Sequence, residues 1–456
     1  MGGEAADSHC FSIDTALTLL RTNPLLGFVA TAAIVLSPTL IVSMKGGTGY
    51  CFFVVLALSL AYLGKPEHRR RAAELVRAHR WFALGLLGLP CIVLFQILVL
   101  RTGTFPALDP LLRLALAVPS FCFLATLPSR QLRLVQWGFV LGALGTGAWA
   151  VYATQHPAVW MSPGRLGNSF TNPIPFGDTA LLLGFLSIAS AKRGGSTNVV
   201  EWVIRVAALL AGGYASYLSG TRGGWVAVPM LAWAAVNRRH WLANARSRVA
   251  IGCAVLVCVA VLAGTSVVRE RVDAIGADVQ HMNHGNMDTS LGARLDLWRA
   301  SALLCAQHPV LGVGRGSLEG ALRALARRGE VPPVIVNGRA HSEFFSVLAE
   351  MGTVGVAALL LLYSATFLPF WHSRKHADPD IVTASYLGIA LVGSTILFGL
   401  TIDVLTLVMN AAFFALTAVT LLAWIEARKR ELADAQQSLS HSEGRLTGRR
   451  APVGIE

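Results

Sequence analysis

Charged residues are scarce in this sequence. Only 14% of the 456 residues are Asp, Glu, Lys or Arg, whereas 54% are hydrophobic. Soluble globular domains carry about 25% charged residues. This shortage excludes a soluble fold for a chain of this length. Because apolar runs recur along the whole sequence, the composition predicts one integral membrane domain rather than several soluble domains.

Patterns that would bind a metal, a dinucleotide or a disulfide framework are also missing. The seven cysteines form no CxxC pair and lie mostly inside apolar runs. The Gly312-x-Gly314-x-Gly316 run follows no predicted strand, so it does not indicate a dinucleotide site. The DxD-like Asp378-Pro379-Asp380 falls on the predicted cytoplasmic side. We therefore expect no metal and no cofactor.

Segments long enough to cross a bilayer, about 20 residues in a helix, are present in large number. They predict an all-α polytopic membrane protein with about twelve transmembrane helices. The expected spans are 25–44, 50–63, 81–100, 111–127, 134–152, 174–191, 199–218, 223–236, 249–268, 344–370, 381–400 and 404–425. The first run is long enough to be retained as a span rather than removed as a signal peptide.

Basic residues orient these spans. The net charge of +13 is explained better by membrane topology than by nucleic-acid binding. Lys and Arg gather in alternate short loops, and this marks those loops as cytoplasmic. We expect both termini in the cytoplasm. The basic inner segments are 65–80, 130–133, 192–193, 238–248, 374–375 and 428–430.

One loop, 269–343 between spans nine and ten, is long and is expected on the extracytoplasmic side. Ser290 is a suitable cap for a helix running to Gln307, and a second short helix is expected from Leu318 to Arg328. We assign residues 1–432 to a single transmembrane domain. The polar, Ser- and Gln-rich residues 433–456 are expected to form a disordered cytoplasmic tail.

Three arginines stand out at the predicted outer membrane face: Arg165, Arg222 and Arg294. An arginine near hydrocarbon is costly without a partner, and its planar fork suits bidentate pairing with phosphate oxygens. Arg222 also lies between glycines that allow a ligand to approach the backbone. These residues are candidates for clamping a lipid-linked pyrophosphate. The alternative for each arginine is snorkelling to lipid headgroups.

His341 opens the tenth span at its outer boundary and is the candidate catalytic base, since an imidazole titrates near neutral pH. A structural or interfacial histidine is the alternative. Glu350 lies deeper in the same span and is either functional or paired with another helix. Glu350 and Trp298 are possible supporting residues.

These segments together resemble the O-antigen ligase and polymerase family of bacterial membrane glycosyltransferases. The resemblance covers roughly residues 150–360. It rests on the Arg165 segment, Ser219-Gly220-Thr221-Arg222-Gly223, the run Arg294…Trp298…His308-Pro309…Gly312-x-Gly314, and His341…Glu350-x-Gly352-x-x-Gly355.

The resemblance implies a GT-C-type fold and an inverting, metal-independent transfer of O-antigen polysaccharide. Undecaprenyl pyrophosphate carries the donor, and lipid A–core oligosaccharide is the acceptor at the periplasmic face of the inner membrane. Arg222, Arg294 and Arg165 would bind the donor pyrophosphate, and His341 would activate the acceptor hydroxyl. The short region after the last span favours lipid A–core over a protein acceptor.

Three alternatives remain open at this point. An O-antigen polymerase or a protein O-oligosaccharyltransferase of the same family would use similar residues. A secondary transporter is disfavoured, because transporters place charged or broken-helix sites near the membrane midplane, often in repeats. Here the arginines gather at the outer face. No nucleic acid is expected as a partner.

Overall fold

The computed structural model describes residues 24–157, 165–191, 198–238, 290–336 and 339–448, and these residues form helices without any β-strand. The helices are α2 (Pro24–Leu40), α3 (Gly47–Leu63), α4 (Pro66–Ala78), α5 (Arg80–Phe95), the π-helical η1 (Gln96–Leu100), α6 (Phe105–Leu124), α7 (Ser129–Leu132), α8 (Val135–Gln155), α9 (Pro173–Ala189), α10 (Val199–Leu218), η2 (Gly223–Ala227), α11 (Val228–Arg238), α14 (Ser290–Gln307), α15 (Leu318–Arg327), η4 (Pro333–Ile335), α16 (Glu343–Ser373), α17 (Pro379–Phe398), η5 (Val404–Thr406) and α18 (Val408–Gly448).

The length and composition of these helices confirm a polytopic membrane protein. Within the described ranges, seven helices are long and apolar enough to cross a bilayer, or up to eight if α3 and α4, bent by 115°, count as one span. Two shorter apolar helices, α2 and α9, accompany them. The expected span 249–268 lies outside the described residues. The total of twelve therefore stays a prediction.

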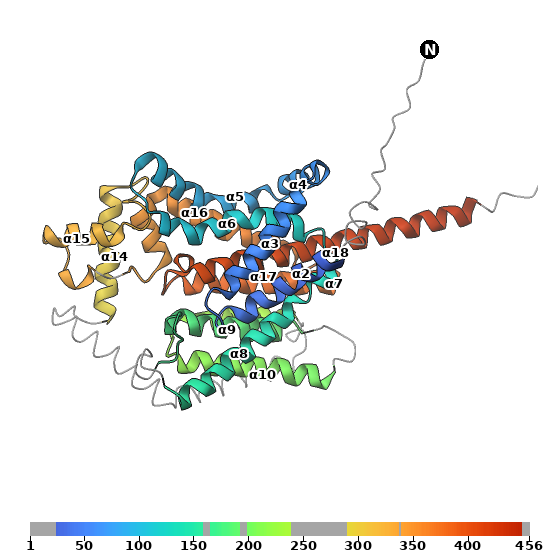
Figure 1. Cartoon of the computed structure of the whole chain (residues 1–456), viewed down its shortest axis with the longest axis horizontal. Helices are drawn as coiled ribbons and strands as arrows, with labels where there is room; N and C mark the ends of the chain where they lie inside the picture. The colour runs from blue at the N-terminus through green and yellow to red at the C-terminus, as the bar shows by residue number, and fades with distance from the viewer. Residues whose placement is uncertain (1–23, 158–164, 192–197, 239–289, 337–338, 449–456) are drawn as a thin grey trace, which may run out of the picture.

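The bundle is centred on α17 and α18. The apolar windows of these helices are 83% and 89% buried by protein, against 28% for α10, which lies at the periphery. Helices α5, α6 and α16 lie on one side of this centre, and α8, α9 and α10 lie on the other (Figure 1). Burial on all sides explains why α17 and α18 have apolar residues around most of their circumference.

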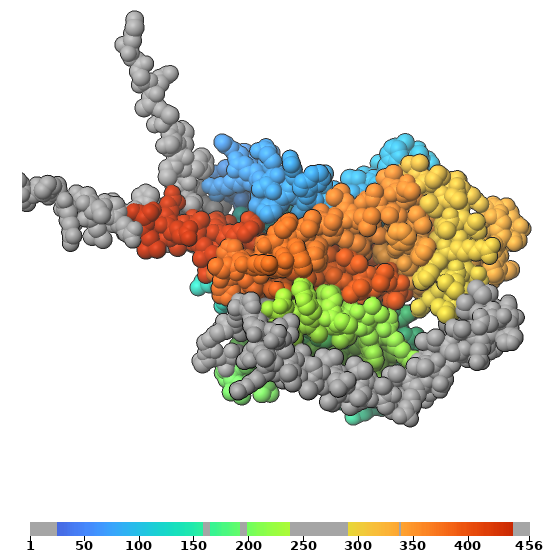
Figure 2. All heavy atoms as spheres, turned by 180° about the vertical axis from the view of Figure 1, so that it is seen from behind, coloured from blue at the N-terminus to red at the C-terminus, as the bar shows by residue number. Residues whose placement is uncertain are grey.

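The two ends of the bundle differ. At one end, α14 and α15 pack on the beginning of α16 around a small apolar core of their own, which includes Leu297, Leu304, Leu322 and Ala349. Figure 2 shows this yellow unit seated at the end of the bundle, and α18 projects from the opposite end. We call these the His341 end and the Arg428 end. Both helices expected within the loop, Ser290 to Gln307 and Leu318 to Arg328, are present as α14 and α15.

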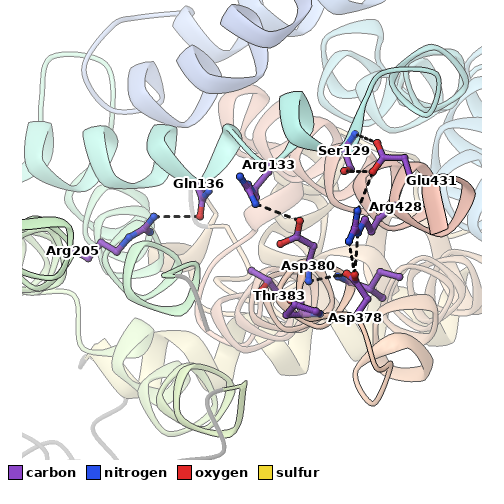
Figure 3. Close-up of polar contacts among 11 residues, drawn as sticks. Ser129, Arg133, Gln136, Arg205, Asp378, Asp380, Thr383, Arg428 and Glu431 are labelled. Carbon is purple, nitrogen blue, oxygen red and sulfur yellow. Dashed lines mark hydrogen bonds and ion pairs between the residues drawn. The ribbon is translucent and has the colours of Figure 1, made fainter. Parts of the chain in front are cut away.

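A polar network joins three helices at the Arg428 end (Figure 3). The guanidinium of Arg428 lies 2.8 Å from the carboxylate of Asp378, which caps α17 by accepting backbone N–H bonds from residues 380 and 381. Ser129, at the start of α7, donates its hydroxyl to Glu431 of α18 at 2.6 Å. Burial opposes ionisation of Asp378, but the hydrogen bonds from Arg428 and the cap hold the pKa of this carboxyl below its usual range.

A second polar group near the same end lies inside the bundle. Arg205 of α10 is 1% exposed, yet its guanidinium donates to the Ser187 carbonyl at 2.8 Å, to the Ser190 hydroxyl at 2.6 Å and to the Gln136 side chain at 3.2 Å. An arginine in this setting needs such partners. It ties α10 to α8 and α9, the group that carries Arg165 and Arg222 at its far end.

The last helix continues further than the composition suggests. The sequence predicts disorder from Ala433, whereas α18 runs on to Gly448. The first residues of this extension, 433–437, are two alanines, two glutamines and one aspartate, and alanine and glutamine are good helix formers. The extension prolongs a helix already nucleated inside the bundle. Propagation from an existing helix avoids the cost that would keep the isolated segment unfolded.

Candidate functional site

The His341 end is organised by a break in α16. Gly352 has φ 62°, a left-handed value that interrupts the helical backbone inside Glu343–Ser373. The loop that follows α14 fills the break: the backbone N–H of Thr353 donates to Pro309, and those of Val313 and Gly314 donate to Ala349 and Glu350, all between 2.9 and 3.0 Å. The glycine-rich loop is therefore bonded to the helix that begins beside His341.

Close backbone contact explains the glycine at the centre of this loop. Gly312 has φ 65°, and a Cβ atom there would lie 2.4 Å from the carbonyl carbon of Glu350. A Cβ at Gly352 would likewise lie 2.5 Å from the Val310 carbonyl. Both positions need a residue without a side chain, because the two backbones touch. The glycine-rich run thus serves packing between the loop and α16.

A buried cluster of charges lies beneath the loop. Arg315 pairs with Glu350 at 2.8 Å and with Glu343 at 3.5 Å, and both Arg315 and Glu343 are 2% exposed. The second oxygen of Glu350 accepts the Gly316 N–H at 2.9 Å. Burial alone would lower the pKa of the Arg315 guanidinium, but Glu350, Glu343 and Asp403 raise it above its usual value. Arg315 therefore carries its charge in the protein interior.

Gln96 links this cluster to the first half of the chain. Its amide nitrogen donates to the carbonyls of Leu311 at 2.6 Å and Glu350 at 2.9 Å, and its oxygen accepts the backbone N–H of Arg315 at 3.0 Å. Gln96 begins η1, the π-helical turn at the end of α5. Such turns are frequent at functional sites, and this one aims a fully buried polar side chain at the loop.

The segment between α17 and α18 completes the cluster. Glu343 accepts the backbone N–H of Leu405 at 2.7 Å, and its own N–H donates to the Gly399 carbonyl at 2.8 Å. Ser346, one turn further along α16, donates its hydroxyl to Asp403 at 2.7 Å. The start of α16 is therefore fixed against residues 399–406.

A polar cavity of about 360 Å³ opens beside these residues. Its walls contain two arginines, three carboxylates and several hydroxyls, the groups that bind sugars and phosphates through hydrogen bonds. It is lined by Thr104, Pro106, Ala107, Pro110, Arg315, Gly316, Leu318, Glu319, Arg339, Ser346, Glu350, Asp403 and Thr406.

His341 lies between two lining residues in sequence, Arg339 and Ser346, and is half-buried. Its φ of 49° is left-handed, a conformation that is strained for most residues and found at functional sites. Burial lowers the pKa of His341, and the positive charges of Arg294 and Arg339 lower it further, while Asp403 acts in the opposite direction. The imidazole is therefore neutral at neutral pH.

Trp298 supports the backbone just before His341. The indole N–H of Trp298 donates to the Ala340 carbonyl at 3.0 Å, and its ring stacks on Phe345 with centroids 5.0 Å apart. Trp298 thus connects α14 to both sides of the His341 turn. Arg294 lies one turn earlier on α14, is half-buried, and acts electrostatically on His341.

Arg165 and Arg222 belong to a second group of residues at the same end. The Nε of Arg165 donates to the Ser219 carbonyl at 3.2 Å. The Ser219 hydroxyl donates to Thr221 at 2.8 Å, and the Thr221 hydroxyl donates to the Pro173 carbonyl at 2.9 Å. Arg222, half-buried, directly follows this hydrogen-bonded turn. Local hydrogen bonds therefore hold the Arg165 and Arg222 segments together.

The two groups meet through the segment 399–406. A Cβ added at Gly223 would lie 2.6 Å from the Thr401 hydroxyl, so the Arg222 turn touches the segment that carries Asp403. Asp403 in turn acts electrostatically on His341. All of the candidate residues, Arg165, Arg222, Arg294, Trp298, His341 and Glu350, accordingly gather at one end of the bundle.

Sequence reasoning missed several residues of this cluster. Gln96 is a lone amide in an apolar run, and a polar group in a membrane span is itself a sign of function. Glu343 is an acid at the start of a span, and the same reasoning applies. Arg315 occupies the second x position of the Gly312-x-Gly314-x-Gly316 run. Among the described residues, no three His, Cys, Asp or Glu side chains gather as metal ligands would.

The described helices thus define a polytopic membrane protein that has a polar cavity, buried charges and a histidine at one end of its bundle. Residues 207–360 match the model of the protein family described as O-antigen ligase, so this segment is similar to that family. The match confirms the expected resemblance. It includes Arg222, Arg294, Trp298, His341 and Glu350, and Arg165 lies outside it.

One curated relative also matches. It is a Haemophilus influenzae protein of uncharacterised function, 22% identical over 237 residues. The alignment covers 50% of this chain and 58% of the relative, so the chain spans little more than half of the relative's length.

Proposed function

We propose that this protein transfers O-antigen polysaccharide from undecaprenyl pyrophosphate to lipid A–core oligosaccharide at the periplasmic face of the bacterial inner membrane. The observation that carries the proposal is the half-buried His341, whose pKa is lowered by burial and by Arg294 and whose sequence neighbours Arg339 and Ser346 line a polar cavity. A general base must be unprotonated at the operating pH and close to the group that it deprotonates. The lowered pKa of His341 favours the unprotonated imidazole, and the cavity offers room for the acceptor sugar whose hydroxyl is to be deprotonated.

In the proposed reaction, the acceptor sugar enters the polar cavity and His341 removes the proton from its attacking hydroxyl. The oxygen attacks the anomeric carbon of the donor sugar, and the bond between that carbon and the pyrophosphate breaks. Attack from the face opposite the leaving group inverts the anomeric carbon. The products are the new glycosidic bond and undecaprenyl pyrophosphate, and both substrates reach the site within one leaflet, which makes proximity a large part of catalysis.

The leaving group gains negative charge as the bond breaks, and fixed positive side chains can stabilise it without a metal ion. Arg222 and Arg294 are proposed to bind the pyrophosphate, with Arg165 in support. The hydrogen-bonded turn at 219–221 and the contact between Arg165 and Ser219 support this role, because they hold the arginine-bearing backbone in place before substrate arrives. Snorkelling alone does not require such a turn.

Glu350 and Trp298 are proposed as supporting residues. Glu350 binds Arg315 and the loop, and Trp298 holds the Ala340 carbonyl beside the strained His341 backbone. A GT-C-type fold remains part of the proposal. An O-antigen polymerase is the second candidate, because a lipid-linked glycan would also fit as acceptor in the polar cavity.

The experiment that tests the function offers purified protein two acceptors. Donor glycan on undecaprenyl pyrophosphate is supplied with either lipid A–core or a second lipid-linked glycan. Transfer to lipid A–core supports the ligase. Elongation of the lipid-linked glycan alone supports the polymerase, and transfer to neither acceptor contradicts both.

A further inference from the structure

A second cavity, of about 450 Å³, lies at the His341 end but outside the cluster described above. It is formed where the chain leaves α2, along the last turns of α8, and by the loop just after Arg165. Its volume lies in the range of small-ligand pockets, about 300–1,000 Å³. It is lined by Val42, Ser43, Gly145, Ala148, Trp149, Tyr152, Asn168, Ser169 and Phe170.

The walls of this aromatic pocket are held in place by hydrogen bonds. The indole N–H of Trp149 donates to the Gly167 carbonyl at 2.9 Å. The amide of Asn168 donates to the Val42 carbonyl at 2.8 Å, and its oxygen accepts the Phe170 N–H at 3.1 Å. Tyr152 lies beside Trp149, with ring centroids 5.8 Å apart. The aromatic faces are thus oriented before any ligand binds, which lowers the entropic cost of binding.

The pocket and Arg165 share one segment. Arg165 contacts Ser219, and the next residue, Leu166, donates its backbone N–H to the Leu218 carbonyl at 2.9 Å. The carbonyl of Gly167 then accepts the hydrogen bond from the Trp149 indole, and the pocket wall begins at Asn168. A ligand with an anionic group at Arg165 and Arg222 would therefore have its adjoining part beside the aromatic pocket.

We propose that this pocket binds a sugar ring of the lipid-linked donor glycan, next to the pyrophosphate. A pyranose has an apolar face of C–H groups, which packs on an aromatic ring, and a rim of hydroxyls, which needs hydrogen-bonding partners. Trp149, Tyr152 and Phe170 supply the ring faces. The exposed hydroxyls of Ser43 and Ser169 and the second lone pair of the Asn168 oxygen supply the partners.

This inference rests on the proposed function, since it assumes a glycan on a lipid pyrophosphate. The isoprenoid chain of the same donor is the other possible occupant. An entirely apolar chain would take the Ser169 hydroxyl and the second lone pair of the Asn168 oxygen out of water without supplying a hydrogen bond, which is unfavourable. The lining therefore favours the sugar over the lipid.

Equilibrium binding to purified protein in nanodiscs tests the inference, with two ligands that differ only in the glycan: lipid-linked O-antigen unit and undecaprenyl pyrophosphate. The variants are Tyr152→Leu and Trp149→Leu. Trp149→Phe keeps a ring face, and Trp81→Leu is the control, since Trp81 is a 60% exposed aromatic at the start of α5. Size-exclusion elution reports whether each variant folds.

Loss of one stacked ring is expected to weaken glycan-bearing donor about five- to tenfold, corresponding to about 1–1.4 kcal/mol. Binding of undecaprenyl pyrophosphate should stay unchanged. Trp149→Phe, which keeps a ring face but loses the hydrogen bond to Gly167, should bind glycan-bearing donor more tightly than Trp149→Leu, and Trp81→Leu should bind both ligands like wild type. Equal weakening of both ligands would assign the pocket to the isoprenoid, and no weakening of either would exclude a glycan there. Either outcome overturns the inference.

The binding result is independent of transfer. If the wild-type protein binds glycan-bearing donor through these rings but transfers it to no acceptor, the proposed function fails and the pocket assignment stands. If transfer is normal and the leucine variants bind glycan-bearing donor normally, the assignment fails and the proposed function stands.

Discussion

Arg315 and Glu350 form an ion pair of 2.8 Å inside the His341 end, and their side chains are only 2% and 9% exposed. The pair connects the loop after α14 to the first part of α16, just before the break at Gly352. Glu343 is the second carboxylate on the same guanidinium. The turn that carries His341 therefore packs near a buried cluster of three paired charged groups.

Removal of Arg315 should destabilise the protein strongly, because two buried carboxylates would lose their counter-charge. Loss of one partner of a buried pair costs about 3–5 kcal/mol. We expect Arg315→Met to lower the thermal unfolding temperature in detergent. Arg323→Met is the matched control, since Arg323 pairs with Glu319 on the exposed face of α15 and should contribute little. Equal unfolding temperatures of the two variants would refute the role assigned to Arg315.

Replacement of Gly312 by alanine should also lower the unfolding temperature. The new Cβ would meet the Glu350 backbone at 2.4 Å, and φ 65° would be strained for alanine. Gly320 is the control: it lies within α15, and a Cβ there meets nothing within 4 Å. Gly320→Ala should stabilise the helix by up to about 1 kcal/mol. The contact between loop and helix would be contradicted if Gly312→Ala unfolded at or above the temperature of Gly320→Ala.

Lysine should fail to replace arginine at the proposed pyrophosphate site. Arg222→Lys and Arg294→Lys keep the charge but lose the planar fork that pairs with two oxygens at once. Loss of such a contact at a developing charge typically costs about 10²–10³ in rate. Initial rates of transfer measure this, with Arg323→Lys as the conservative control on exposed α15. Near-normal rates in both variants would favour lipid snorkelling.

The acidic side of the pH–rate profile should report the charges around His341. A base acts only when neutral, so activity is lost as the pH falls through the pKa of His341, which burial and Arg294 place below its usual value. Arg294→Gln removes a positive neighbour, so it should raise this pKa and move the loss of activity to higher pH. Asp403→Asn removes a negative neighbour and should move it to lower pH. Shifts in the same direction, or none, would contradict His341 as the titrating group.

Much of the fold could be predicted from local sequence. Apolar runs of sufficient length identified most of the described membrane helices, and the helix expected from Ser290 to Gln307 has the limits of α14. These predictions succeed because hydrophobic length and helix signals act over a few turns. The extension of α18 to Gly448 was missed, because composition alone ignores propagation from a buried helix.

The candidate site could be predicted only in part. The arginine and histidine segments were identified by residue type, and the structure gathers them at one end. Their partners were not identified: Gln96 meets the Arg315 backbone across 219 residues of sequence, and Asp403 meets Ser346 across 57. Such contacts depend on how α5, α16 and α17 pack, which no local pattern specifies.

The most direct test of the central claim is transfer by His341→Asn. Asparagine tolerates the left-handed backbone at this position, so the variant removes the base while sparing the φ of 49°. Purified wild-type and variant proteins are given lipid-linked O-antigen and lipid A–core in excess EDTA without added metal. We predict rapid transfer by the wild type and almost none by His341→Asn, with donor binding equal in both. Comparable transfer by the variant, or wild-type transfer that appears only when manganese is restored, would contradict the account.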